Sequence, residues 1–105
     1  MLLEVEVESL DQLREALRPE VDRILVDNRS VDEVRTAVRE VDRWLKEHPP
    51  DSPRMPAGAR RWPEIEVSGG INLDTIRAFA EAGPDRISVG ALTHSARAVD
   101  LSLEF

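Results

Sequence analysis

The stretch IEVSGGINLDTIRAFAEAGPDRISVGALTHS, residues 65–95, holds two apolar runs with a helical pattern between them. The runs at 65–68 and 86–90 have the length and the β-branched content of buried strands. Between them, Asn72 is a helix N-cap and Gly83-Pro84 is a helix stop. The apolar residues between these signals recur at helical spacing: Leu73, Ile76, Phe79 and Ala80. A strand, a helix and a second strand in this order predict a parallel βαβ unit with a right-handed crossover.

The same alternation occupies the first half of the chain and continues to its end. Strand-like runs lie at Leu2–Glu8 and Asp22–Asp27. Each is followed by a capping-box pattern that predicts a helix start, at Ser9-Leu10-Asp11-Gln12 and Ser30-Val31-Asp32-Glu33. The second helix carries an apolar stripe of Val31, Val34, Val38, Val41 and Leu45. We also expect a short helix over Thr93–Val99 and an extended tail over Leu101–Phe105. The order β-α-β-α-β-α-β-α predicts an α/β fold with four parallel βα units.

A Pro-rich segment, residues 48–63, interrupts this rhythm. It contains Gly58, two adjacent arginines and five prolines, at positions 49, 50, 53, 56 and 63. Such a composition between a helix and a strand indicates a surface excursion within one domain of residues 1–105, not a linker between two domains. We expect the flanking Trp44 and Trp62 to hold the excursion against the body of the protein. The alternative is that the two indoles form a ligand-stacking site.

Composition excludes several classes of function. The 105 residues carry a net charge of −7, which argues against nucleic acid or an anionic membrane as the main partner. There is no cysteine, so a disulfide framework and a cysteine zinc site are excluded. No apolar run approaches the roughly 20 residues that span a bilayer, and the start of the chain lacks the basic residues of a signal peptide. We therefore expect a cytoplasmic protein.

Two glycine clusters follow neighbouring predicted strands, Ser68-Gly69-Gly70 and Gly90-Ala91-Leu92-Thr93. Glycine lets successive backbone N–H groups converge, and it leaves room for an anion to approach. Each cluster precedes a predicted helix, whose N-terminus favours negative charge. In parallel α/β folds the ligand lies at the carboxyl ends of the strands. The pair of clusters predicts a phosphate site, and two ordinary tight turns are the alternative.

Two carboxylates fall near the same strand ends. Asp27 comes directly after a buried apolar run, a position typical of a catalytic or metal-binding acid, and a helix cap is its rival role. Glu6 belongs to the alternating series Glu4, Glu6 and Glu8, which predicts one acidic strand face with or without a ligand role. His94 lies inside the second glycine cluster, where a phosphate contact, a capping role and a plain structural role all stay open. His48 is expected to interact with the C-terminal dipole of its helix.

Four segments together resemble the quinolinate phosphoribosyltransferase family. They are EVEVES at 4–9, LVDN at 25–28, EVSGGI at 66–71 and VGALTHS at 89–95. The family implies a two-domain subunit, with an N-terminal α/β domain and an incomplete α/β barrel, usually paired in homodimers. This chain matches the C-terminal half of that barrel.

The resemblance also implies an activity and a set of residue roles. Members transfer the ribosyl 5-phosphate of phosphoribosyl pyrophosphate to quinolinate, giving nicotinate mononucleotide, pyrophosphate and carbon dioxide in NAD biosynthesis. Glu6 and Asp27 match the acids that hold ribose hydroxyls and magnesium. The phosphate-holding loops are matched by Ser68, Gly69, Gly70, Gly90 and Ala91.

The family's basic residues that grip quinolinate and pyrophosphate have no counterpart in this chain. We therefore expect the chain to be inactive alone and to act with a complementing chain or as a homo-oligomer. The alternative is a non-catalytic half-barrel module for binding or oligomerisation, with a vestigial phosphate site.

Overall fold

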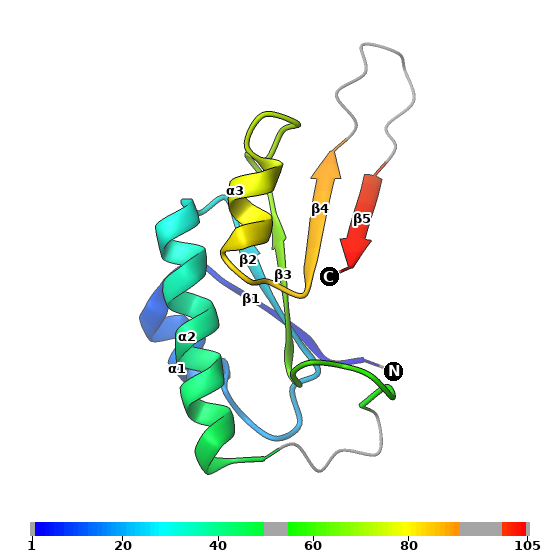
Figure 1. The fold of residues 1–105 in the computed structure, drawn as a ribbon. Coiled ribbons are helices and arrows are strands. Elements are labelled where there is room, and N and C mark those ends of the chain that lie inside the picture. The colour runs from blue at the N-terminus through cyan, green and yellow to red at the C-terminus, as the bar shows by residue number, and fades with distance from the viewer. Residues whose placement is uncertain (1, 50–54, 91–99, 105) are drawn as a thin grey trace.

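Within the part of the chain that the structure describes, the sheet contains five strands in the order β1-β2-β3-β4-β5 (Figure 1). The computed structural model describes residues 2–49, 55–90 and 100–104. The strands are β1 (Glu4–Val7), β2 (Arg23–Asp27), β3 (Glu64–Ser68), β4 (Arg86–Gly90) and β5 (Asp100–Glu104). The first four run parallel to one another, as the alternating pattern predicts. The expected extended tail is β5, which pairs antiparallel with β4. The helix expected over Thr93–Val99 lies outside the described residues.

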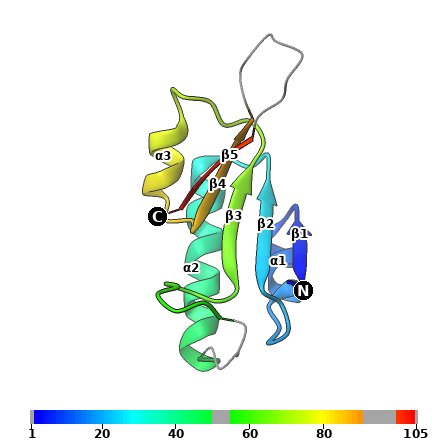
Figure 2. The same cartoon turned by 90° about the vertical axis from the view of Figure 1, so that its right-hand side faces the viewer.

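In the described residues, three helices cover one face of this sheet (Figures 1 and 2). They are α1 (Leu10–Ala16), α2 (Val31–Glu47) and α3 (Ile76–Glu81). Alternate strand residues point toward them and are buried: Val7, Ile24, Val26, Ile65, Val67, Ile87 and Val89. The helices add Leu13, Val34, Val38, Val41 and Phe79 to this core. The other sheet face carries mostly polar residues, such as Glu6, Asp27 and Ser68, and no helix of the described ranges covers it (Figures 1 and 2). None of the helices in the described ranges has the length and apolar character to cross a membrane.

The helix starts follow the predicted caps in two cases out of three. At α2, Ser30 Oγ accepts from the Glu33 N–H at 3.1 Å, and Glu33 Oε1 accepts from the Ser30 N–H at 3.0 Å. At α1, Ser9 Oγ accepts from the Gln12 N–H at 3.1 Å. These contacts satisfy N–H groups that have no partner within the helix.

The predicted start of α3 at Asn72 is wrong. Asn72 Oδ1 accepts from the backbone N–H groups of Asp74 and Thr75, at 2.9 and 3.0 Å, and so closes a turn ahead of the helix. The helix begins only at Ile76. Leu73, expected on the apolar face, is 72% exposed. The Asn side chain offers the backbone a local alternative to helical hydrogen bonds, which shortens the helix.

The described part of the Pro-rich segment is held at the amino ends of the strands. Trp62 is buried, and its Nε1 donates to Asp22 Oδ1 at 3.0 Å. Arg61 Nη1 donates to the Gly83 carbonyl at 2.8 Å and to Asp85 Oδ2 at 3.1 Å. Trp62 therefore holds the segment as predicted. Because its indole is buried, the alternative of a ligand-stacking site is wrong for Trp62, while Trp44 stacks on His48.

Two buried aspartates lie directly before strands and accept backbone hydrogen bonds in the same way. Asp22 precedes β2, and its Oδ2 accepts from the Leu3 N–H at 2.8 Å. Asp85 precedes β4, and its Oδ2 accepts from the Ile65 N–H at 2.8 Å. Each therefore ties the start of its own strand to the preceding strand in the sheet. Desolvation raises the pKa of Asp85 above its ordinary value, against the opposing effects of this hydrogen bond and of the Arg61 charge.

Candidate functional site

The strand register brings Asp27 and Ser68 together at the carboxyl edge of the sheet. The two residues are paired across β2 and β3, and the Ser68 hydroxyl donates to Asp27 Oδ1 at 3.2 Å. Their neighbours Val26 and Val67 are buried under the helices, so the Asp27 and Ser68 side chains lie on the opposite, polar face. The prediction that these two residues share one rim is consistent with this register.

Gly69 and Gly70 adopt backbone conformations in which a residue with a side chain would be strained. Their φ values are +78° and +67°, in the left-handed region. A Cβ at Gly69 would lie 2.5 Å from Asp27 Oδ1 and 3.1 Å from the Asn28 nitrogen. A Cβ at Gly70 would lie 2.9 Å from Asn28 Oδ1. The glycine pair thus lets the β3 loop pack directly against the end of β2.

Asn28 is part of this cluster, and sequence reasoning missed it. Its N–H donates to the Ser68 carbonyl at 2.8 Å, which extends the β2–β3 ladder past the last paired residues. Its φ is +53°, a conformation that Asn tolerates better than most residues. The signal was available in the sequence, because an Asn directly after a strand is a common site of a left-handed turn.

The loop after Gly70 differs from the predicted one. Residues 71–75 separate the glycine pair from α3, so the helix N-terminus does not follow the glycines directly. The N-terminus of α3 therefore lies further along the chain from the glycine pair than predicted, and its contribution to a phosphate site stays a prediction.

Glu6 lies on the same polar face as Asp27 but further from the rim. It is exposed and is paired in register with Leu25, two residues before Asp27. From the strand spacing and the rise per residue, the Cα atoms of Glu6 and Asp27 are about 8 Å apart. Two carboxylates can hold a magnesium ion that takes its other ligands from substrate phosphates and water. Within residues 2–49, 55–90 and 100–104, no group of three or more His, Cys, Asp or Glu could hold a metal by itself.

The second glycine cluster is described only at its first residue. Gly90 ends β4 and is paired with Asp100 of β5. Ala91 and His94 lie outside the described residues. Their assignment to a phosphate loop stays a prediction.

The polar face below the rim carries a row of alternating charges. Glu64 Oε1 accepts from Arg23 Nε at 2.6 Å and from Arg86 Nε at 2.8 Å, and Glu4 lies 4.0 Å from Arg23. Burial lowers the pKa of Arg23, but its hydrogen bond to Glu64 and the nearby acids outweigh this and raise it. Both arginines are therefore engaged with acids of the same face. A polyanionic substrate would need positive charge from another source.

Comparison with known proteins shows the family to which this arrangement belongs. The family model described as "Quinolinate phosphoribosyl transferase, C-terminal domain" matches residues 1–104. The chain belongs to this family. It is 40% identical over 102 residues to the "Probable nicotinate-nucleotide pyrophosphorylase [carboxylating]" of Methanocaldococcus jannaschii, which covers 97% of this chain and 32% of that protein. It is 38% identical over 101 residues to the "Nicotinate-nucleotide pyrophosphorylase [carboxylating]" of Mycobacterium leprae, covering 96% of this chain and 30% of that protein.

A solved structure of the quinolinate phosphoribosyl transferase family has the same fold. The nicotinate-nucleotide pyrophosphorylase of Francisella tularensis matches with a TM-score of 0.63 and 30% identity, over 97% of this chain and 32% of that one. The α/β fold with parallel strands and the family resemblance are thus confirmed. The chain spans about a third of the length of the relatives it matches.

Proposed function

We propose that this chain forms the ribose- and phosphate-binding part of a quinolinate phosphoribosyltransferase. The complete enzyme would transfer the ribosyl 5-phosphate of phosphoribosyl pyrophosphate to quinolinate and release pyrophosphate and carbon dioxide. The observation that carries this proposal is the contact of Ser68 with Asp27, 3.2 Å long, beside two glycines in the left-handed region. It places an acid, a hydroxyl and an open backbone at one edge of the sheet.

In this proposal Asp27 and Glu6 act on the ribose. Departure of pyrophosphate leaves positive charge on the ribose ring, which nearby carboxylates stabilise in the transition state. The Ser68 hydroxyl donates to Asp27 Oδ1, which orients the carboxylate and leaves Oδ2 for a ribose hydroxyl. Glu6 and Asp27 would also hold magnesium, which supplies charge neutralisation to the pyrophosphate leaving group.

The phosphate is assigned to the two glycine loops. Gly69 and Gly70 carry no side chain toward the rim, so their N–H groups are accessible to phosphate oxygens. The single hydroxyl proton of Ser68 is donated to Asp27 Oδ1, so Ser68 would serve this edge by holding Asp27 in place. We assign Gly90, Ala91 and His94 to the second loop on the resemblance to the family.

We further propose that residues 1–105 are the C-terminal half-barrel, with the Pro-rich segment at about 48–63 as an insertion, in a cytoplasmic enzyme. The chain alone is expected to be inactive, because Arg23 and Arg86 are engaged with Glu64 and leave a net-negative protein to bind two polyanions. The missing positive charge would come from a complementing segment that pairs with the β1 edge or from a second copy.

The test is calorimetric titration of the 105-residue chain with phosphoribosyl pyrophosphate and magnesium. We expect saturable binding, weakened about tenfold to hundredfold in Asp27→Asn and Ser68→Ala, since the first removes the carboxylate charge and the second removes the hydroxyl that orients this carboxylate. Asp11→Asn is the matched control, because Asp11 lies on α1 and its side chain is 90% exposed. Equal binding in Asp27→Asn and the wild type would refute the assignment.

The second candidate is a non-catalytic half-barrel module for oligomerisation. Leu2 and Leu3, at the start of the β1 edge, are 47% and 44% exposed, which favours pairing of this edge with another strand. A folded chain that binds no phosphoribosyl pyrophosphate but forms dimers in sedimentation would favour this module over the enzyme part.

A further inference from the structure

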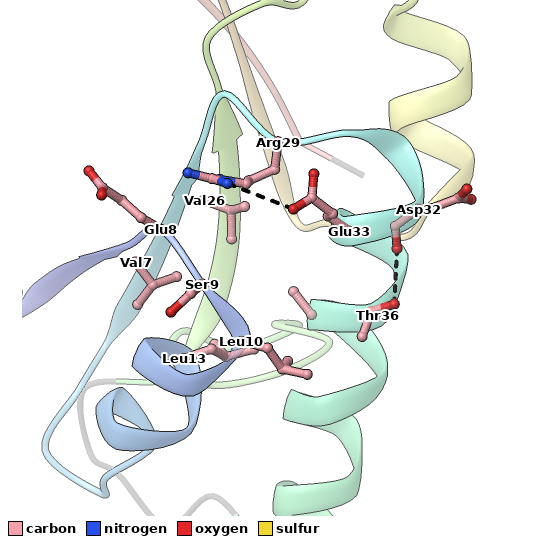
Figure 3. Close-up of a pocket in the computed structure, with 11 residues that line it drawn as sticks. Val7, Glu8, Ser9, Leu10, Leu13, Val26, Arg29, Asp32, Glu33 and Thr36 are labelled. Carbon is pink, nitrogen blue, oxygen red and sulfur yellow. Dashed lines mark hydrogen bonds and ion pairs between the residues drawn. The ribbon is translucent and has the colours of Figure 1, made fainter.

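A cavity of about 290 Å³ lies on the helix side of the sheet (Figure 3). It is partly open to solvent and lies between the ends of β1 and β2 and the first turns of α1 and α2. Its residues are Val7, Glu8, Ser9, Leu10, Leu13, Val26, Arg29, Asp32, Glu33, Thr36 and Ala37. Val7 and Val26 face this cavity, whereas their neighbour Asp27 faces the opposite side of the sheet.

The wall of the cavity is apolar and its mouth is polar. Val7, Leu10, Leu13, Val26 and Ala37 supply the wall. An apolar wall with a few polar groups at one end is the usual composition of a small-molecule site, and this volume is near the lower limit for such sites. The cavity therefore has room for an apolar body the size of one ring.

Arg29 has a buried nitrogen that lacks a hydrogen-bond acceptor. Its Nε is buried and has no hydrogen-bond partner among the described residues. Its Nη1 forms an ion pair with Glu33 Oε2 at 3.8 Å, longer than a hydrogen bond, and the side chain as a whole is 35% exposed, so the unpartnered atom is Nε alone. Figure 3 shows the guanidinium crossing the top of the cavity toward Glu8. A buried donor without an acceptor destabilises the fold. A ligand oxygen that accepts from Arg29 Nε would therefore bind favourably.

The charged side chains around the mouth of the cavity decide which kind of ligand oxygen can approach Arg29. Glu8 and Glu33 line the same opening as Arg29, whereas Asp32 bonds Arg35 at 3.0 Å and points away (Figure 3). A ligand carboxylate would meet two acids and one arginine, and a ligand amine would offer Arg29 no acceptor. A neutral carbonyl oxygen satisfies the arginine without this repulsion.

We propose that this cavity binds a small uncharged molecule with an apolar body and a carbonyl oxygen that accepts from Arg29. The test is NMR titration of the ¹⁵N-labelled chain with three probes of equal body: benzamide, benzoate and benzylamine. Benzamide should shift the amide signals of Ser9, Leu10 and Arg29, with a Kd on the order of 1 mM for a ligand of this size. Benzoate and benzylamine should bind at least about fivefold more weakly. Tighter binding of either charged probe, or no shift with benzamide, overturns the proposal.

Two variants separate the arginine from the cavity space. Arg29→Met keeps the length of the side chain and removes the donors, so benzamide binding should weaken about tenfold. Arg35→Met is the matched control on α2 and should bind as the wild type does. Ala37→Leu fills the cavity and should abolish benzamide binding while leaving phosphoribosyl pyrophosphate binding unchanged. Unchanged benzamide binding in Arg29→Met overturns the proposal, and this outcome is independent of the phosphate site.

Discussion

The two halves of the sheet, β1-α1-β2 and β3-α3-β4, are alike at their amino ends and different at their carboxyl ends. Asp22-Arg23-Ile24 enters β2 and Asp85-Arg86-Ile87 enters β4. In both halves the aspartate accepts the backbone N–H of a residue at or beside the start of the preceding strand, at 2.8 Å. In both halves the arginine donates to Glu64. The amino ends of the strands in the two halves are thus held by the same kinds of hydrogen bond.

The carboxyl ends differ in the loop that leaves the first strand of each half. Only residues 8 and 9 separate β1 from α1, and Ser9 caps that helix directly. Residues 69–75 separate β3 from α3, and this longer loop carries the glycine pair. The comparison teaches that the repeated ends of the sheet provide stability, while the varied ends provide the candidate site. The same division is general in α/β barrels.

The largest effect should come from removing either aspartate. We expect Asp22→Ala and Asp85→Ala each to lower the free energy of unfolding by about 3 kcal/mol, because each leaves buried donors without an acceptor. Urea denaturation measures both, with Asp11→Ala as the exposed control. A difference between the two variants larger than about 1 kcal/mol would break the equivalence of the halves.

A smaller effect is expected at the glycine loop. Gly69→Ala should lower the free energy of unfolding by about 2–3 kcal/mol, since it combines a left-handed φ with an approach of 2.5 Å to Asp27 Oδ1. Gly58→Ala is the matched control, because Gly58 has a φ of +86° and open space around it. That variant should lose about 1 kcal/mol. Equal losses in urea denaturation would mean that the contact with Asp27 contributes nothing.

Variants in the turns before α1 and α3 should separate an effect on stability from an effect on binding. Ser9→Ala removes the α1 cap and should lower the free energy of unfolding by about 1 kcal/mol, with no change in phosphoribosyl pyrophosphate binding. Asn72→Ala opens the turn after the glycine pair and should weaken that binding as well. Calorimetry and urea denaturation of both variants provide the test. Intact binding in Asn72→Ala would show that the loop does not need its turn.

The smallest effect is a pH dependence at Asp85. Burial raises its pKa in the folded protein above the ordinary value of 3.8. A carboxyl group of this kind stabilises the fold fully below its unfolded pKa, and this stabilisation is lost as pH rises through the folded pKa. The free energy of unfolding of the wild type minus that of Asp85→Asn should therefore fall as pH rises from the unfolded pKa through the higher folded pKa. A rise over that range would show that Arg61 and the Ile65 N–H dominate over burial.

Local signals in the sequence were sufficient for most of the elements. The apolar runs predicted β2, β3 and β4 to within one residue, and the capping boxes predicted the starts of α1 and α2. These signals act over three or four residues along the chain, so they are readable without the fold. The left-handed glycine pair after β3 was likewise visible in Ser68-Gly69-Gly70.

Contacts between distant residues were decided by tertiary structure. The start of α3 at Ile76, six residues after Gly70, is a separate case, because it came from a local turn at Asn72 that competes with the helix. The pairing of Asp27 with Ser68 joins residues 41 positions apart, and it exists only in one register of β2 against β3. The bond of Trp62 to Asp22 and the cavity under Arg29 arise in the same way. The sequence by itself determined which segments form strands and helices, because hydrogen bonds and apolar periodicity are local. The packing of the sheet decided which side chains meet, because that depends on register and on the direction of every crossover.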